Sequence, residues 1–137
     1  MQFAGISYLG VLFAAGVGFA FGAAYYTLLG KYWMAAVGKT KEEIENDKSP
    51  LPFIIAAVAQ LVIAFVLAGA VGHLGYGMVN IPNAVITGLI LWVGFIATTI
   101  AVNYAFQGAK YELIAIDAGH WLGVVIVQGL IIGWVGL

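Results

Sequence analysis

Residues 53–72 read FIIAAVAQLVIAFVLAGAVG, a continuous apolar run that contains no charged residue. At a rise of 1.5 Å per residue, a helix of this length crosses the ~30 Å hydrocarbon core of a bilayer. Three further apolar runs of similar length cover about 8–29, 84–106 and 113–135. Because these runs are continuously apolar and do not alternate, they predict helices and not barrel strands. The fold is therefore predicted to be an all-α membrane protein, with residues 1–137 forming a single bundle of four transmembrane helices.

The composition agrees with this prediction. Hydrophobic residues make up 64% of the chain and charged residues 8%, against roughly 25% charged residues in a soluble domain. The surplus apolar surface needs the lipid bilayer as its partner. With five lysines, no arginine and a net charge of −1, nucleic-acid binding is not expected. The chain has no cysteine, and one intramembrane aspartate with two histidines predicts neither a metal site nor a cofactor.

The lysines predict the orientation. Eight of the eleven charged residues lie within 31–48, and every lysine lies either there or at Lys110. These two connections fall on the same side of a four-span protein, so the positive-inside rule places the loop 30–52 in the cytoplasm and both termini outside it. Residues 1–10 carry no positive charge, which predicts a retained helix and not a cleaved signal peptide. The expected location is the cell (inner) membrane, with multiple spans.

Local signals predict how the connections end. Thr40 and Glu43 have the spacing of a capping box, so a short helix is expected over Lys41–Asn46. In the middle connection, Asn83 is expected to cap the third span.

An internal repeat is one interpretation of the first and third runs. A shift of 78 residues pairs Tyr26 with Tyr104 and aligns four small residues of the first run with small residues of the third. This pattern is typical of two parallel helical hairpins, as in some transporters. Coincidence in a chain with 19 glycines is the alternative, because the second and fourth runs align less clearly.

A small set of polar residues lies inside the predicted spans. Asp117 and His120 are three apart and therefore share a helix face. As intramembrane ionisable groups they predict a proton-handling pair or a ligand contact. The alternative is structural: the two pair with each other, or Asp117 reaches the headgroups, and hydrogen bonds to an asparagine or a tyrosine hydroxyl group fix the packing. The same two interpretations apply to the other candidates, which are Tyr26, Gln60, Thr98, Thr99 and Asn103.

Glycine pairs with GxxxG spacing predict close helix packing. They leave open whether the neighbour belongs to the same chain or to a homodimer. The pairs are Gly18 and Gly22, Gly119 and Gly123, and Gly129 and Gly133.

Several stretches carry a family resemblance. They are AYY at 24–26 through GKYW at 30–33, GKTKEEI at 38–44, GFIATT at 94–99 with NYAF at 103–106, and IDAGH at 116–120. In order and spacing the chain resembles the bacterial membrane proteins of the domain of unknown function 1761 family. One departure is Thr27-Leu28, where the family pattern predicts a proline. The resemblance implies a small four-helix membrane protein and brings no established activity. It also points to the polar residues of the third and fourth runs.

Three functions follow as hypotheses. The first is a small-solute or proton-coupled transporter or channel module that works as a dimer. The second is a structural or accessory membrane protein whose polar residues serve helix packing only. The third is a membrane enzyme acting on lipid, which is the weakest because no serine or cysteine stands near Asp117 and His120 to act as a nucleophile. The identity of a small-molecule ligand does not follow from the sequence.

Overall fold

The computed structural model of the protein describes residues 5–136, and every regular element in that range is a helix. Four helical stretches are long and apolar enough to cross a membrane, which confirms the predicted all-α membrane fold. The third stretch is one continuous helix made of α4, a π-helical segment η1, and α5. The elements are α1 (Tyr8–Val37), α2 (Lys41–Asn46), α3 (Leu51–Gly72), α4 (Ile81–Leu91), η1 (Trp92–Ala97), α5 (Thr98–Phe106) and α6 (Tyr111–Val135).

Helix α1 extends eight residues beyond the expected end of its apolar run at position 29. An isolated glycine such as Gly30 lowers helix propensity but does not end a helix by itself. The helix ends at Gly38 instead, which adopts a left-handed conformation (φ 77°) and donates its N–H to the Met34 carbonyl group at 2.9 Å. Glycine is the residue that enters this conformation without a steric penalty.

The connections confirm one local prediction and correct another. Helix α2 has its capping box, with the Thr40 hydroxyl group accepting from the Glu43 N–H at 3.2 Å and the Glu43 carboxylate accepting from the Thr40 N–H at 2.7 Å. The prediction for Asn83 was wrong. Asn80 is the N-cap of α4, and its side chain accepts from the Asn83 N–H at 3.0 Å. Pro82 explains the difference, because proline fits the first turn and lets the helix begin earlier.

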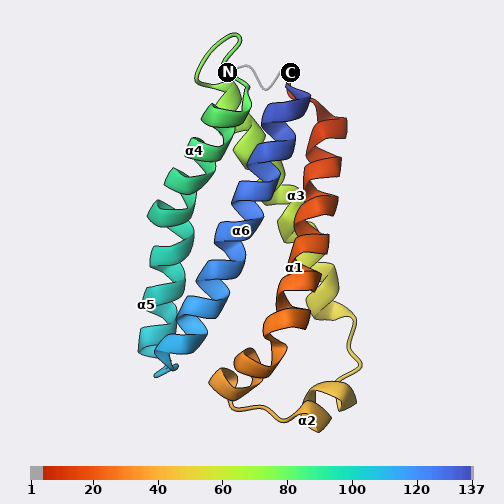
Figure 1. Cartoon of the computed structure of the whole chain (residues 1–137), viewed down its shortest axis with the longest axis vertical. Coiled ribbons are helices and arrows are strands. Elements are labelled where there is room, and N and C mark those ends of the chain that lie inside the picture. Colours follow the sequence, from red (N-terminus) through yellow and green to blue (C-terminus); the bar gives the residue numbers. More distant parts are fainter. Residues whose placement is uncertain (1–4, 137) are drawn as a thin grey trace.

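Helix α6 lies at the centre of the bundle and contacts each of the other three spans. Helix α1 and the α4–α5 helix lie on either side of it, with α3 behind (Figure 1). Helix α1 begins and α6 ends at the same end of the bundle, and α2 lies at the opposite end. We call this opposite end, which carries the connections 38–50 and 107–110, the lysine end. That it faces the cytoplasm stays a prediction.

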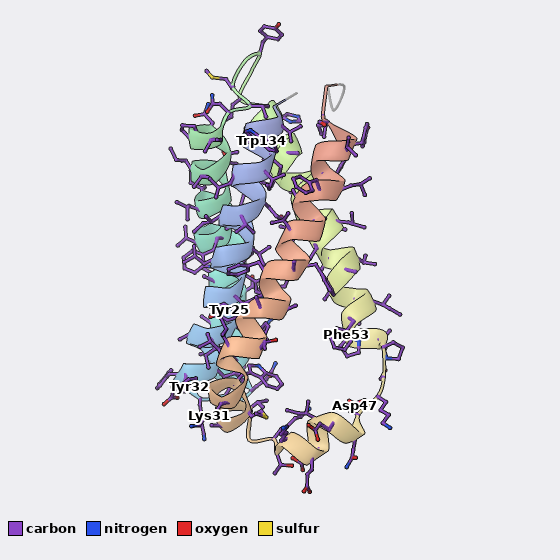
Figure 2. All side chains as sticks on the ribbon, turned by 45° about the vertical axis from the view of Figure 1, so that its right-hand side comes forward. Tyr25, Lys31, Tyr32, Asp47, Phe53 and Trp134 are labelled. Carbon is purple, nitrogen blue, oxygen red and sulfur yellow. The ribbon has the colours of Figure 1, made fainter. Side chains whose placement is uncertain are left out.

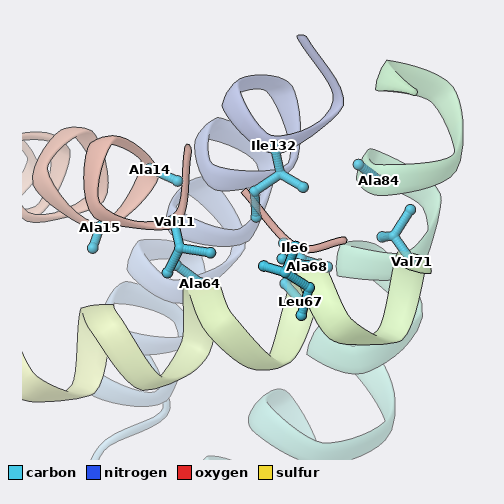
Figure 3. Close-up of a cluster of buried hydrophobic side chains, with 10 residues drawn as sticks. All are labelled: Ile6, Val11, Ala14, Ala15, Ala64, Leu67, Ala68, Val71, Ala84 and Ile132. Carbon is cyan, nitrogen blue, oxygen red and sulfur yellow. The ribbon is translucent and has the colours of Figure 1, made fainter. Parts of the chain in front are cut away.

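The apolar core fills the half of the bundle away from the lysine end (Figure 3). It is built from small or branched side chains, which let the helices approach closely. The buried polar side chains lie between this core and the lysine end, and they are Gln60, Asp117, His120 and Gln128. The core residues are Ile6, Val11, Ala14, Ala15, Ala64, Leu67, Ala68, Val71, Ala84 and Ile132.

The glycines of α6 pack against helices of the same chain. Gly129 and Gly133 lie against the α4 backbone, where a Cβ atom at Gly133 would stand 2.5 Å from the Ile81 nitrogen. Gly119 and Gly123 face aromatic rings of α1. The glycines of α6 therefore have packing partners within the same chain. The homodimer stays a prediction.

Candidate functional site

Asp117 joins three helices near the lysine end. Its side chain is 9% exposed, and each carboxylate oxygen accepts one hydrogen bond from a tyrosine. Tyr26 of α1 donates to Oδ1 and Tyr104 of α5 donates to Oδ2, both at 2.7 Å. These are the two tyrosines that the 78-residue shift aligns. The repeat itself stays a prediction. It would relate α3 to α6, and these two helices occupy different places in the bundle.

Two further side chains hold α6 in place around the same carboxylate. The Tyr25 hydroxyl group donates to the Ile116 carbonyl oxygen at 2.8 Å. From the other side, the indole N–H of Trp92, at the start of η1, donates to the Ala118 carbonyl oxygen at 2.9 Å. The register between α6 and its two neighbours is therefore set by hydrogen bonds on both sides of Asp117.

His120 lies one turn further along α6 and is 7% exposed. No hydrogen bond joins it to Asp117 within residues 5–136, where the carboxylate accepts from the two tyrosines. The imidazole Nδ1 is buried and has no hydrogen-bond partner in the described chain. Gly22 of α1 makes room for the ring, since a Cβ atom there would stand 2.7 Å from Nε2.

Aromatic rings surround this imidazole. Their centroids lie 4.7 to 6.4 Å from the centroid of the imidazole ring. The rings are those of Phe21, Tyr25 and Tyr26 on α1 and of Trp121 on α6. His120 is thus fixed by packing, while its Nδ1 has no hydrogen-bond partner within residues 5–136.

A glutamine pair separates this region from the apolar core. Gln128 of α6 donates through Nε2 to the side-chain oxygen of Gln60 on α3 at 2.7 Å and to its backbone oxygen at 3.2 Å. Both residues are buried. Gly18 of α1 lies opposite, where a Cβ atom would stand 2.9 Å from Gln128 Nε2. The sequence singled out Gln60 as an isolated polar residue, and its partner was not foreseen.

A cavity of about 550 Å³ lies between α1, α3 and α6 in the lysine-end half of the bundle. Ile44 of α2 and Phe53 at the start of α3 border it toward the lysine end. Figure 2 shows Phe53 standing apart from the part of α1 that carries Tyr25. Gln60 and His120 lie in its wall, and none of its described lining residues is charged. The volume falls within the range of small-molecule sites.

Three predicted candidates lie elsewhere. Thr98, Thr99 and Asn103 are exposed on the outer face of the third span, and the two threonine hydroxyl groups bond to carbonyl groups of their own helix. Because Tyr104 faces α6, its neighbour Asn103 is turned about 100° away. The structure therefore does not bring these three residues together with Asp117 and His120.

A family model described as a protein of unknown function (DUF1761) matches residues 9–133. The chain belongs to the DUF1761 family. The match covers most of every span, including Asp117, His120 and both tyrosines of the carboxylate. For this DUF1761 protein, no curated protein and no solved structure gives a match.

Some residues of this DUF1761 site were missed by sequence reasoning. Tyr104 was not among the predicted candidates, although its 78-residue spacing from Tyr26 was a usable signal. Trp121 and Phe53 gave no signal of their own. An aromatic residue in a span normally serves helix packing or anchors the helix at the membrane interface. Among residues 5–136, no group of three or more acidic or histidine side chains is placed to hold a metal ion.

Proposed function

We propose that this multi-pass membrane protein is a small-solute transport module whose binding site is the cavity beside His120. The observation that carries the proposal is the buried Nδ1 atom of His120, which has no partner within residues 5–136. A polar group in hydrocarbon is costly unless it is paired. The His120 ring lies in the wall of a 550 Å³ cavity, and rotation of this ring would bring its unpaired nitrogen to a partner that comes and goes.

The arrangement of the two halves supports transport from one side at a time. The apolar core fills the half away from the lysine end, the glutamine pair closes it off, and the cavity occupies the other half. This conformation would then be the one in which the site faces the lysine end. Movement of α3 against α1 and α6 would open the site to the opposite side, as alternating access requires.

A structural or accessory role is the second candidate, and Asp117 favours it. Both of its oxygens are satisfied by tyrosines from two other helices, which is what a packing role needs. We therefore assign Asp117 to helix packing and His120 to the ligand. A membrane enzyme is not proposed, because no Asp117–His120 hydrogen bond is present within residues 5–136 to form a dyad.

Cysteine labelling tests the proposal, since the chain contains no cysteine of its own. Thr27→Cys and Ala56→Cys place a thiol in the cavity wall, and Ala64→Cys places one in the fully buried core beyond the glutamine pair. Val62→Cys, exposed outside this cavity, is the matched control. Each variant is treated with a membrane-impermeant maleimide from either side of oriented vesicles.

We expect the two cavity thiols to react from the lysine side, the Ala64 thiol to react slowly from the other side, and the control to stay unlabelled. Labelling of the cavity thiols from the lysine side alone would indicate binding without transport. If no cavity thiol reacts from either side, the bundle is dry and the packing role replaces the proposal.

A further inference from the structure

We infer that the cavity beside His120 takes an uncharged molecule with a flat apolar body and one oxygen that accepts a hydrogen bond. This inference rests on the proposed function for the location of the binding site, and it adds the chemical class of the ligand. Simple phenols and quinone-like rings belong to this class.

The walls indicate the flat apolar body. Four aromatic side chains from three helices line the cavity, and they are Phe19, Tyr26, Phe53 and Trp121. Aromatic rings bind a flat partner by offset stacking or by edge-to-face contact. The remaining wall is largely aliphatic, so an extended polar molecule such as a sugar would leave its hydroxyl groups unpaired.

Two neutral polar groups in the wall indicate the oxygen. The side-chain oxygen of Gln60 is taken by Gln128, whereas its Nε2 donor has no hydrogen bond in the described chain. The second group is His120, whose Nδ1 is also unpaired there. A carbonyl or hydroxyl oxygen on the ligand would accept from the Gln60 amide, and the imidazole, once its ring turns toward the cavity, would complete the contact.

Thr27 also lines the cavity, but its hydroxyl group is not free to donate to a ligand. Its hydroxyl group already donates to the Ala23 carbonyl oxygen of its own helix at 2.7 Å. Its donor is therefore used within α1 and is not free for a ligand, which leaves the Gln60 amide as the donor in the wall.

The electrostatics of the site exclude ions of either sign. No described residue in the wall carries a formal charge. Asp117 is linked to the wall through Tyr26, but both of its oxygens are held by tyrosines and it does not line the cavity. An anion would meet no lysine in the wall, because none of the described lining residues is a lysine. An unpaired ion loses more hydration than the aromatic walls return.

The experiment uses three probes that share one ring: 2-naphthol, 2-naphthoate and 2-naphthylmethylammonium. The full chain is reconstituted in lipid nanodiscs with 5-fluorotryptophan at its four tryptophan positions, and ¹⁹F resonances are recorded during titration. The Trp121 resonance reports on the cavity wall. Trp134, 70% exposed at the far end of α6, is the internal control.

We expect 2-naphthol to shift the Trp121 resonance saturably, and both charged probes to bind at least tenfold more weakly. Gln60→Met should weaken naphthol binding about tenfold by removing the amide donor, and Thr98→Val, on the outer face of the third span and outside the cavity, should leave it unchanged. Binding of either charged probe as tightly as naphthol would overturn the inference, and so would equal losses in the two variants.

The charge series needs only the unaltered chain, so the inference stays testable even if Gln60→Met fails to fold. If none of the three probes shifts Trp121 while the Thr27→Cys thiol still labels, the inference fails and the proposed function stands. If that thiol is also silent, the proposed binding site itself is absent.

Discussion

Removal of one tyrosine hydroxyl group tests whether Asp117 holds the helices together. In Tyr104→Phe, the bond of 2.7 Å to Oδ2 is lost, and the buried oxygen, in a side chain that is 9% exposed, gains little water in exchange. Hydrogen bonds to charged groups contribute roughly 1.5–3 kcal/mol, and those measured within membranes reach at most ~1.7 kcal/mol. We expect the free energy of unfolding to fall by about 1.5 kcal/mol, where the two ranges meet.

The assay is reversible unfolding in mixed detergent micelles, followed by circular dichroism. Tyr111→Phe is the matched control, because Tyr111 is 86% exposed and the same chemical change there removes no hydrogen bond in the described chain. The control should stay within about 0.5 kcal/mol of the parent protein. Adding Asp117→Asn to both backgrounds completes a double-mutant cycle, in which we expect a coupling of about 1 kcal/mol between Tyr104 and Asp117.

A loss in Tyr104→Phe no larger than in Tyr111→Phe would refute this reasoning. It would mean that the carboxylate keeps its partners in another way, by water or by movement of Tyr26. The assignment of Asp117 to packing would then have to be withdrawn, and Asp117 would return to the list of candidate ligand groups. Because Tyr104 does not line the cavity, naphthol binding should be unaltered in the Tyr104 variant.

Three further predictions follow from the packing. Gly133→Ala should destabilise the protein by about 1–3 kcal/mol in the same assay, since its Cβ atom would stand 2.5 Å from the Ile81 nitrogen. At Gly16 a Cβ atom meets nothing within 4 Å, so Gly16→Ala should stabilise the protein by up to ~1 kcal/mol. Gln128→Leu alone should cost about 2 kcal/mol because it leaves Gln60 unpaired, and a double leucine variant should regain at least half of that loss. The pKa of Glu43 lies below its ordinary value of 4.5, because the N-cap residue of α2 donates hydrogen bonds to it. The contribution of this cap to stability should therefore be complete above pH 4.5 and be lost as the pH falls through the lowered pKa of Glu43. An NMR titration of the Glu43 carboxylate should show a midpoint below 4.5.

The spans could be predicted from the sequence because their signal is local. The run 53–72 already has the length and apolarity of a crossing, and α3 follows it within two residues. The capping box of α2 needs only four consecutive residues and was found for that reason. The end of α1 was missed because Gly30 and Lys31 resemble a helix end, while the helix continues to a glycine that takes a left-handed conformation.

The site was predictable only where it depends on one helix. The shared face of Asp117 and His120 follows from their spacing. The partners of Asp117 do not, since Tyr26 is 91 residues away in the chain and its contact depends on the register between α1 and α6. On the third span, the π-helical turns of η1 change the rotation of everything that follows. An ideal α-helix therefore misplaces Asn103, which was expected to face the bundle.

The central position of α6 bears on the order in which the protein can be assembled during synthesis. Ribosomes deliver α1, α3 and the α4–α5 helix to the membrane before α6, yet each of these contacts α6 in the finished bundle. Until the last helix inserts, both tyrosines of the carboxylate lack their acceptor and Gln60 lacks its partner. Before α6 inserts, the other three spans therefore carry unpaired polar groups in lipid. A chain halted before residue 111 would leave those groups without partners, so closure of this bundle depends on the insertion of α6.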